Sequence, residues 1–231
     1  MKKIGLLKML ERYPLFTFNE FVRVTGKTPE YSRTYLHRLK KEGLVFQVEK
    51  GKYTVFEDPM VFSSYITLPS YISFWTAIRF YNFTEQLPRD IMLASPKPKK
   101  NMVFNKKRIR FFKTKHMWGY KKQRYRDFDI FVAEKEKSII DSLLLRNIPF
   151  SEVVKAVQTK DFDAGKLVEY AIKTKNKSLM KRLGYMMEIS GIDGRGKLIE
   201  HFDRNYILLS WNGKASGKKN KKWRIILNGG V

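Results

Sequence analysis

Near the N-terminus, the spacing of the apolar residues changes from that of a helix to that of a hairpin. Residues 29–42 show a helical repeat, and two short apolar runs at 44–48 and 52–56 then flank a turn, which predicts a β-hairpin. A helix that leads directly into a hairpin is typical of the winged helix-turn-helix, a fold that reads DNA. The helix residues expected to face a core are Ser32, Tyr35, Leu36 and Leu39.

Capping signals support this interpretation. Thr28 can accept a backbone N–H at the start of the 29–42 helix, and Gly43 can end that helix in the left-handed conformation. Thr17 and Glu20 have the spacing of a capping box, which predicts a further helix directly upstream. A first helix is expected at residues 2–12. The side chains expected to close the core from this first helix are Ile4, Leu7 and Leu10.

The chain is expected to form two domains, a winged helix-turn-helix at residues 1–57 and a larger mixed α+β domain at residues 58–231. The fold class is therefore α+β. In the second domain, helical spacing predicts a helix at 71–83, and the segments 206–211 and 223–227 are expected to be strands that flank a polar, basic hairpin loop. Further strands are expected at 90–94, 108–113 and 125–132. Further helices are expected at 134–145, 151–157, 163–174 and 178–190.

The charge balance indicates a polyanionic partner. The chain has 47 Lys and Arg against 22 Asp and Glu, a formal net charge of +25 over 231 residues. Double-stranded DNA is the leading candidate partner, because this excess accompanies a winged-helix pattern. A membrane partner is disfavoured, since no run of about 18 uninterrupted apolar residues occurs. No signal-peptide pattern follows Met1, so a cytoplasmic location is expected.

The residue types exclude several kinds of site. The sequence has no cysteine, so disulfides, iron–sulfur clusters and Cys-ligated zinc are excluded. The three histidines, His37, His116 and His201, lie far apart and lack metal-ligand spacing. We therefore expect no cofactor.

The polar face of the 29–42 helix is the candidate DNA-reading surface. Arg is the usual partner of guanine in the major groove, so Arg33 and Arg38 are the first candidates for base contact. The alternative is a solvated basic face. Lys50 and Lys52 on the hairpin are expected to contact phosphate, which positions a protein without specifying sequence. The other candidate DNA contacts in this region are Thr28, Tyr31, Thr34, His37 and Lys41.

A second basic segment, residues 97–126, contains thirteen Lys and Arg and no acid. Alternation along its predicted strand would turn Ile109 and Phe111 inward. Aromatic residues interleave with the cations, a mixture that can stack single-stranded bases, but most of these rings are expected to be core. This segment is expected to extend the contact with DNA. Its candidate phosphate contacts are Lys106, Lys107, Arg108 and Arg110.

Asp127 and Asp129 allow an enzymatic alternative. Two acids with one residue between them on a strand can hold a divalent cation. Such a site would make the second domain a nucleotidyltransferase-like enzyme. Such cations need several oxygen ligands, and the sequence identifies no third carboxylate. Two solvated acids beside Arg124 and Arg126 are the simpler explanation. We expect no metal, no catalytic residue and no enzymatic activity.

Four segments carry a resemblance to a known family. In their order and spacing, they resemble the antitoxin of AbiE-type abortive-infection systems, a type IV toxin–antitoxin family with an N-terminal winged helix. The resemblance implies a transcriptional regulator that represses its own operon, and a C-terminal domain that counters a toxin of the nucleotidyltransferase type. The segments are the predicted winged helix-turn-helix, called the winged unit below, and residues 72–89, 136–143 and 181–191.

Three functions stay open on these grounds. A DNA-binding regulator of the AbiE antitoxin type is the leading one, and an interaction protein that neutralises a toxin is the second. Binding to RNA or the ribosome is the third, because net charge does not distinguish one polyanion from another. The target sequence and the oligomeric state do not follow from these patterns.

Overall fold

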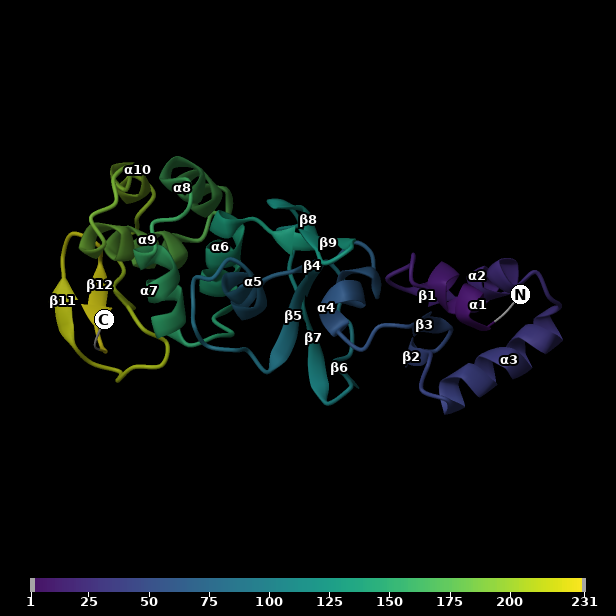
Figure 1. Ribbon diagram of the computed structural model, residues 1–231. Coiled ribbons are helices and arrows are strands. Elements are labelled where there is room, and N and C mark those ends of the chain that lie inside the picture. Colours follow the sequence, from purple (N-terminus) through teal and green to yellow (C-terminus); the bar gives the residue numbers. More distant parts are fainter. Residues whose placement is uncertain (1–2, 230–231) are drawn as a thin grey trace. The chain divides into compact units, whose positions relative to one another are not determined.

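The chain packs into two compact units in the computed structural model, which describes residues 3–229 (Figure 1). Unit 1 runs from the N-terminus to Tyr71 and adds Arg89–Thr114 and Lys122–Phe131. Unit 2 contains Ile72–Pro88, Lys115–Lys121 and the chain from Val132 onward. Helices and strands occur in both units, so the expected α+β class is confirmed. The expected domain boundary after residue 57 stays a prediction.

Unit 1 begins with three helices and a three-stranded antiparallel sheet, the arrangement of a winged helix-turn-helix. Strand β3 is central, with β1 on one side and β2 on the other, and Phe16 lies opposite Tyr53. The sequence pattern did not predict β1. The elements are α1 (Lys3–Leu10), β1 (Phe16–Thr17), α2 (Phe18–Thr25), α3 (Pro29–Lys41), β2 (Phe46–Glu49) and β3 (Lys52–Thr54).

The expected caps place these helices. The Thr17 side chain accepts a hydrogen bond from the Glu20 backbone N–H, and the Glu20 carboxylate accepts one from the Thr17 N–H at 2.6 Å. This reciprocal capping box starts α2. Thr28 accepts a hydrogen bond from the Tyr31 backbone N–H at the start of α3. Gly43, with φ of 69°, adopts the left-handed conformation directly after α3, as the sequence predicted.

A small apolar core holds the winged unit together, and one prediction about it is wrong. Ile4 is 70% exposed, whereas Leu6 is fully buried. Leu6 and Leu10 are four residues apart and therefore share the inward face of α1, to which Ile4 does not belong. The core residues are Leu6, Leu10, Phe16, Phe21, Leu36, Leu39 and Val45.

The rest of unit 1 is built around buried strand β5 (Asp90–Ser95), which pairs in parallel with β7 (Lys107–Lys113). Strand β6 (Met102–Phe104) lies antiparallel on the other side of β7. In β7, Ile109 and Phe111 are buried while Arg108 is exposed, which confirms the expected alternation. The remaining elements wholly in unit 1 are α4 (Pro59–Phe62) and the 3-10 turn η1 (Ser63–Tyr65).

One strand prediction is wrong, because two strands, β8 (Tyr120–Tyr125) and β9 (Phe128–Ala133), meet where a single strand was expected. The segment 125–132, expected to be a single strand, contains the turn between them. Arg126 turns the chain with φ of 51°. The turn at Arg126 and Asp127 contains no Gly or Pro, so the sequence pattern gave no sign of it and the end of β8 was predicted to be one strand with β9.

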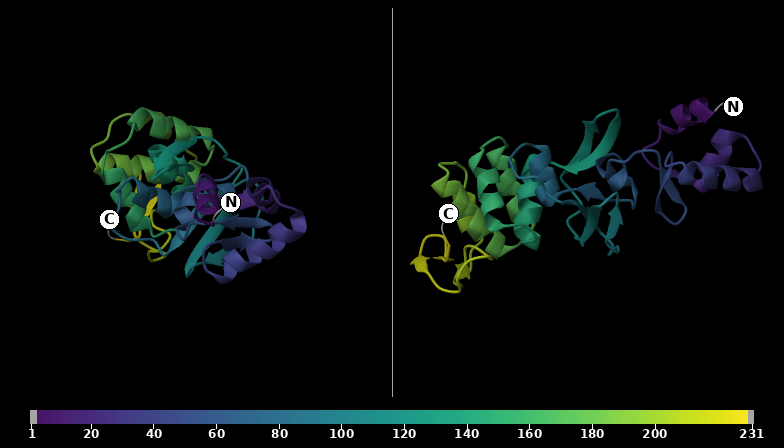
Figure 2. Two further views of the ribbon diagram at one scale, coloured as in Figure 1. Left: turned by 45° about the vertical axis from the view of Figure 1, so that its right-hand side comes forward. Right: turned by 60° about the horizontal axis from the view of Figure 1, so that its bottom comes forward.

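Unit 2 is mainly helical, and Figures 1 and 2 show α6 to α9 packed side by side, in agreement with their contacts. Strand β4 pairs in parallel with β9 through Ile72 and Val132. Within residues 3–229, no helix has the length and apolar character needed to cross a bilayer. The helices are α5 (Phe74–Phe80), α6 (Lys135–Leu145), α7 (Phe150–Gln158), α8 (Ala164–Lys173), α9 (Lys177–Ile189) and α10 (Gly196–Ile199).

Two further expectations in unit 2 are wrong. The predicted helix 71–83 begins as strand β4 (Tyr71–Ile72), and α5 starts only after Ser73. A continuous apolar run fits a buried strand as well as a buried helix, which explains the error. At the C-terminus, β10 (Ile207–Leu208) lies parallel to β12 (Ile225–Leu227), so these two strands cannot form a hairpin. The antiparallel partner of β12 is instead β11 (Lys218–Asn220), which lies inside the expected loop.

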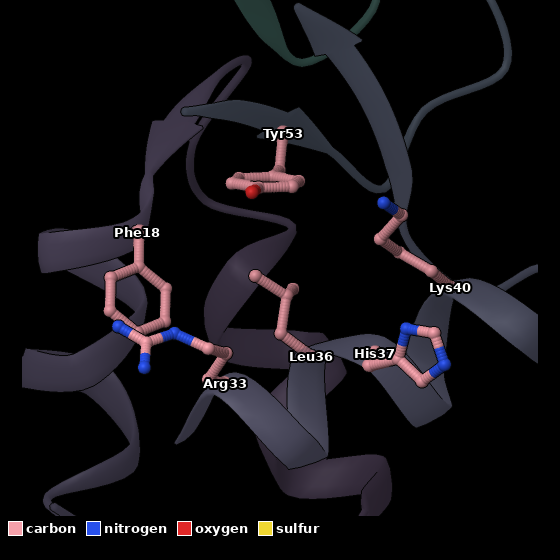
Figure 3. Close-up of a pocket in the computed structure, with 6 residues that line it drawn as sticks. All are labelled: Phe18, Arg33, Leu36, His37, Lys40 and Tyr53. Carbon is pink, nitrogen blue, oxygen red and sulfur yellow. The ribbon is translucent and has the colours of Figure 1, made fainter. Parts of the chain in front are cut away.

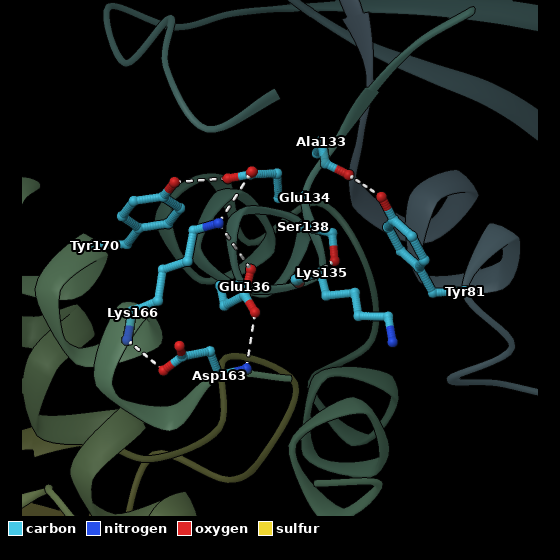
Figure 4. Close-up of polar contacts among 9 residues, drawn as sticks. All are labelled: Tyr81, Ala133, Glu134, Lys135, Glu136, Ser138, Asp163, Lys166 and Tyr170. Atoms are coloured by element: carbon cyan, nitrogen blue, oxygen red, sulfur yellow. Dashed lines mark hydrogen bonds and ion pairs between the residues drawn. The ribbon is translucent and has the colours of Figure 1, made fainter. Parts of the chain in front are cut away.

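The acids at the start of α6 form a satisfied structural network (Figure 4). Lys166 lies 3.0 Å from Glu134 and 3.9 Å from Glu136. The Tyr170 hydroxyl donates to Glu134 at 2.6 Å, and the Asp163 backbone N–H donates to Glu136 at 2.8 Å. Burial and the hydrogen bond to Glu134 raise the pKa of Tyr170 above its ordinary value. Each of these carboxylates faces donors, which fits a structural role at a helix N-terminus.

Lys137 and Asp141 form an i,i+4 ion pair within α6 that is not exposed to solvent. Both side chains are buried, and Ser73 donates a hydrogen bond to the same carboxylate at 2.8 Å. Burial lowers the pKa of Lys137, although Asp141 opposes this effect. The pair therefore belongs to the interior of unit 2, where removing one partner leaves an uncompensated charge.

Candidate nucleic-acid interface

Helix α3 presents two adjacent stripes of polar residues outside its buried face. The buried face is formed by Ser32, Leu36 and Leu39. The stripe opposite to it consists of Thr34, Arg38 and Lys41, which are all exposed. The second stripe, which flanks the first on the side of β3, consists of Arg33, His37 and Lys40. The predicted contacts on α3 therefore occupy two surfaces of the helix.

The second stripe lines a concavity of about 260 Å³ (Figure 3). Its floor is Leu36, and two aromatic rings form its other walls. The Arg33 guanidinium lies 5.6 Å from the centre of the Phe18 ring, and the Lys40 ammonium lies 5.9 Å from the centre of the Tyr53 ring. Cations held over ring faces stay partly oriented, so this concavity is a preformed cationic surface beside the outer face of α3.

Lys40 is a functional candidate that the sequence analysis missed. Its side chain also donates to Gln47 on β2, so it connects α3 to the wing, which is the hairpin of β2 and β3. Lys40 follows Arg33 by seven residues, so both lie on one face of α3. This spacing was the sequence signal that could have identified Lys40. The predicted contact Thr28 is occupied as the N-cap of α3, and Tyr31 is 53% exposed beside it.

The two predicted lysines of the wing have different surroundings. Lys50 is exposed at the turn between β2 and β3. The Lys52 ammonium lies 3.0 Å from Glu49 and donates to the backbone carbonyl of Ile66. Glu49 also pairs with Lys99 at 2.7 Å. Lys50 is therefore free to reach a partner, whereas Lys52 is held in the contact between the wing and the rest of unit 1.

The basic segment 97–126 divides into paired and unpaired cations. Asp90 accepts from Arg108 at 2.8 Å and lies 3.3 Å from Arg110. Lys106 and Lys107 are exposed around the turn from β6 to β7. The cations of the segment that face a carboxylate are Lys99, Arg108, Arg110, Arg124 and Arg126. The cations of the segment that form no ion pair with a carboxylate among residues 3–229 are Lys97, Lys100, Lys106, Lys107, Lys113, Lys115, Lys121 and Lys122.

The aromatic residues of this segment are largely packed within the fold. Phe104 and Phe111 are buried, and Arg110 lies 4.9 Å above the Phe112 ring. In unit 2, Trp118 is half-buried with its ring centre 4.8 Å from that of Tyr170. These rings offer little open face on which a base could stack.

Asp127 and Asp129 lie beside cations of their own hairpin. Asp129 is 3.8 Å from Arg124, and Asp127 is exposed in the turn. Within the part of the chain that the structure describes, no three Asp, Glu or His side chains gather in a way that could hold a metal ion.

Comparison with protein families identifies the winged unit. Residues 6–55 match the family described as transcriptional regulator, AbiEi antitoxin. The AbiEi resemblance is thus confirmed for the segment that contains α2, α3 and the β2–β3 hairpin. The family that this segment resembles is described as one of transcriptional regulators. The match ends before the second basic segment begins.

A solved structure has a similar fold over nearly the whole chain. The crystal structure of the RV2827C protein from Mycobacterium tuberculosis is similar, with a TM-score of 0.69 and 12% sequence identity. The similarity covers 96% of this chain and 88% of that chain. At this identity the likeness shows a shared fold. No curated protein sequence matches the chain.

Proposed function

We propose that this protein is a transcriptional regulator of the AbiEi type that binds duplex DNA through its winged helix-turn-helix. The observation that carries the proposal is the AbiEi family match over residues 6–55, which coincides with an α3 whose outer face is polar, exposed and basic. In winged and related helix-turn-helix proteins, this helix enters the major groove. A net charge of +25 supports a nucleic-acid partner.

The two stripes of α3 have different roles in this proposal. Thr34, Arg38 and Lys41 lie opposite the core, so they face the base edges when α3 enters the groove. Arg33 and His37 lie toward the wing, and with Lys40 they contact the backbone. The cationic concavity of Figure 3 thus receives phosphate rather than a base.

The other cations that carry no carboxylate partner extend the contact. Lys50 on the wing and Lys106 and Lys107 on the β6–β7 turn bind phosphate, because these exposed ammonium groups have no competing carboxylate among the described residues. Arg108 and Arg110 already face Asp90, so they contribute less. We expect the protein to act in the cytoplasm by binding, without catalysis.

Genomic footprinting followed by mutation tests this proposal. The bound site would first be located, and affinity for it would then be compared with affinity for random DNA. Arg38→Ala should lose about 1 to 3 kcal/mol of preference for the site, if Arg38 contacts a base. Lys50→Ala should weaken both DNAs equally, and Lys8→Ala, which removes an exposed cation of α1, should change neither. Unchanged preference in Arg38→Ala and in Thr34→Ala would refute a reading role for α3.

Neutralisation of a toxin is a second candidate function, because the matched family is described as an antitoxin. A toxin of the nucleotidyltransferase type is the expected partner. Co-expression with such a toxin encoded beside this protein's gene should restore growth, and the two proteins should purify as a complex. If growth is not restored and no complex purifies, the protein would be a regulator without a toxin partner. Competition between duplex DNA and duplex RNA at fixed salt tests the RNA-binding alternative.

A further inference from the structure

A hairpin at the C-terminal end of unit 2 presents lysines without a neighbouring acid of its own. We define the basic hairpin as residues 212–228, which contain strands β11 and β12 and no Asp or Glu. Besides Lys222, its exposed lysines are Lys214, Lys218, Lys219 and Lys221. None of these four pairs with a carboxylate within residues 3–229.

Buried polar contacts hold the first half of the basic hairpin in one conformation. The buried Asn228 side chain accepts from the Ser210 backbone N–H and donates to the carbonyl oxygens of Ser210 and Lys214, at 2.7 to 2.8 Å. The Lys214 N–H donates in return to the Asn228 carbonyl at 3.0 Å. A Cβ on Gly217 would lie only 1.9 Å from the Leu227 carbonyl oxygen, so the backbone passes too close for any other residue.

The second half of the basic hairpin is anchored to α9. Trp223 is fully buried and packs directly against Gly184, where a Cβ would lie 1.9 Å from its ring. Next to it, Lys222 pairs with Glu188 of the same helix. Lysines on an anchored backbone lose less entropy on binding than lysines on a mobile loop. The basic hairpin therefore has the construction of a binding surface.

The chemistry of the basic hairpin fits a nucleic-acid backbone rather than unstacked bases. Tyr206 lies beside the hairpin, but Lys219 and Arg224 approach its ring at 5.3 and 5.8 Å. Trp223 is buried, and Trp211 donates to the Ile148 carbonyl at 2.9 Å. A single-strand site needs open aromatic faces, which these residues do not supply. Cations alone suit the phosphates of a duplex.

Protection of a sheet edge does not explain all four lysines. β11 is an edge strand, and edge lysines keep other strands from pairing. This role accounts for Lys218 and Lys219, which lie in β11. Lys214 and Lys221 lie outside the strand, so they call for another explanation.

We propose that the basic hairpin is a second DNA-binding site, in which Lys214, Lys218, Lys219 and Lys221 contact the phosphates of duplex DNA. The proposal rests on the proposed DNA-binding function and adds a contact surface in unit 2. Because the site contacts only phosphate groups, it strengthens binding to DNA of any sequence and contributes no sequence preference.

Salt dependence of binding tests this proposal directly. The variant K214Q/K218Q/K219Q/K221Q of the full chain would be compared with the unchanged protein on a random duplex of about 40 bp, roughly four helical turns. Each lost phosphate contact removes about 0.9 from the slope of log affinity against log salt, so the slope should become shallower by at least about 2. If this variant melts at a lower temperature than the unchanged protein, K218Q/K221Q takes its place, with an expected change of about 1 to 2.

A matched variant controls for net charge. K160Q/K173Q/K175Q/K197Q also removes four exposed lysines of unit 2 that have no carboxylate partner among the described residues. Its slope should change by less than about 1. Equal changes in the two variants would overturn the proposal, since the effect would then come from net charge. A change seen on duplex RNA but not on duplex DNA would also overturn it.

Failure of this inference is distinguishable from failure of the proposed function. The basic-hairpin variant should retain its preference for the footprinted site, whereas Arg38→Ala should lose it. An unchanged slope together with a loss of preference in Arg38→Ala would remove the basic hairpin and leave the winged-helix proposal intact. A shallower slope together with no effect of Arg38→Ala or of Thr34→Ala on preference would keep the hairpin site and remove the reading role of α3.

Discussion

The Lys99 ammonium lies 2.7 Å from the Glu49 carboxylate and thereby ties the wing to the loop that follows β5 in unit 1. Glu49 receives a second ammonium, that of Lys52, at 3.0 Å. A carboxylate repels phosphate, so its presence on a wing that we propose to bind DNA needs a reason. Its effect is to hold two cations in ion pairs, which leaves Lys50 as the exposed cation of the wing without an ion pair.

Glu49→Gln should therefore make DNA binding more dependent on salt. The substitution removes the charge that holds Lys52 and Lys99, and each ammonium released to phosphate adds about 0.9 to the slope of log affinity against log salt. We expect a slope steeper by about 1 to 2 on random DNA, measured by titrations across a range of salt concentrations. A slope equal to that of the unchanged protein would show that Lys52 and Lys99 cannot reach DNA even when released.

Glu49 should also contribute to the pH dependence of stability. Burial raises the pKa of Glu49, but hydrogen bonds from Lys99 and Lys52 outweigh this effect and hold the pKa below its usual value. A carboxylate with a lowered folded-state pKa stabilises the fold above its unfolded-state pKa, and this contribution disappears as the pH falls through the folded-state value. Urea unfolding should show Glu49→Gln to be less stable by about 0.5 to 1 kcal/mol at neutral pH. A deficit that persisted unchanged at about pH 2, where the carboxylate is protonated, would contradict this account.

Local signals explain why the winged unit could be predicted from the sequence. The capping box of Thr17 and Glu20, the cap at Thr28 and the left-handed Gly43 all act between residues that are close in the chain. The contacts that decide which cations are available join distant segments, as Glu49 does with Lys99. No sequence pattern around either residue indicates which residue it will pair with. The sequence could therefore suggest Lys52 as a DNA contact but could not show that Glu49 and the Ile66 carbonyl hold it.

The same limit applies to the sheets. Alternation along β7 correctly placed Ile109 inward, because that signal lies within one strand. The parallel pairing of β10 with β12 joins strands separated by the whole of β11, and short strands of this kind show no period that reveals direction. Asp90 is a further example, since its pairing with Arg108 and Arg110 depends on the parallel register of β5 and β7.

The pairing with Asp90 leads to a prediction about the basic segment. Lys106→Gln with Lys107→Gln removes two cations without carboxylate partners, so the salt slope should become shallower by about 1 to 2. Arg108→Gln with Arg110→Gln removes the same charge but also removes two ion-pair partners of the Asp90 carboxylate. This second variant should lose stability in urea unfolding, with a smaller change in slope. The opposite order of slopes would mean that the arginines bind DNA despite their pairing.

Asp127 and Asp129 should be dispensable for DNA binding. Asp129 lies 3.8 Å from Arg124 with both side chains more than half exposed, so this pair contributes about 0 to 1 kcal/mol at most. Asp127→Asn with Asp129→Asn should leave DNA affinity and the unfolding free energy close to those of the unchanged protein. A metal-dependent nucleotidyl transfer activity that this double substitution abolished would show that the protein is an enzyme.

The contact between Gly184 and Trp223 allows a sharp test of how the basic hairpin is anchored. Gly184 lies inside α9, where replacement of glycine by alanine ordinarily stabilises a helix by about 1 kcal/mol. Here the added Cβ would lie 1.9 Å from the Trp223 ring, and the ring is fully buried against Phe202. Overpacking of this kind costs about 1 to 3 kcal/mol, so Gly184→Ala should destabilise the protein in denaturant unfolding.

Gly165→Ala in α8 provides the matched control. Its Cβ would meet only the Asp163 carboxylate oxygen at 3.3 Å, so the variant should be neutral or slightly more stable. If Trp223 anchors the hairpin, Gly184→Ala should also expose the tryptophan to water and shift its fluorescence to longer wavelength at denaturant concentrations where the rest of the chain stays folded. A Gly184→Ala protein as stable as the Gly165→Ala protein would mean that Trp223 can move aside at little cost. The lysines of the basic hairpin would then lack the fixed backbone on which their proposed role depends.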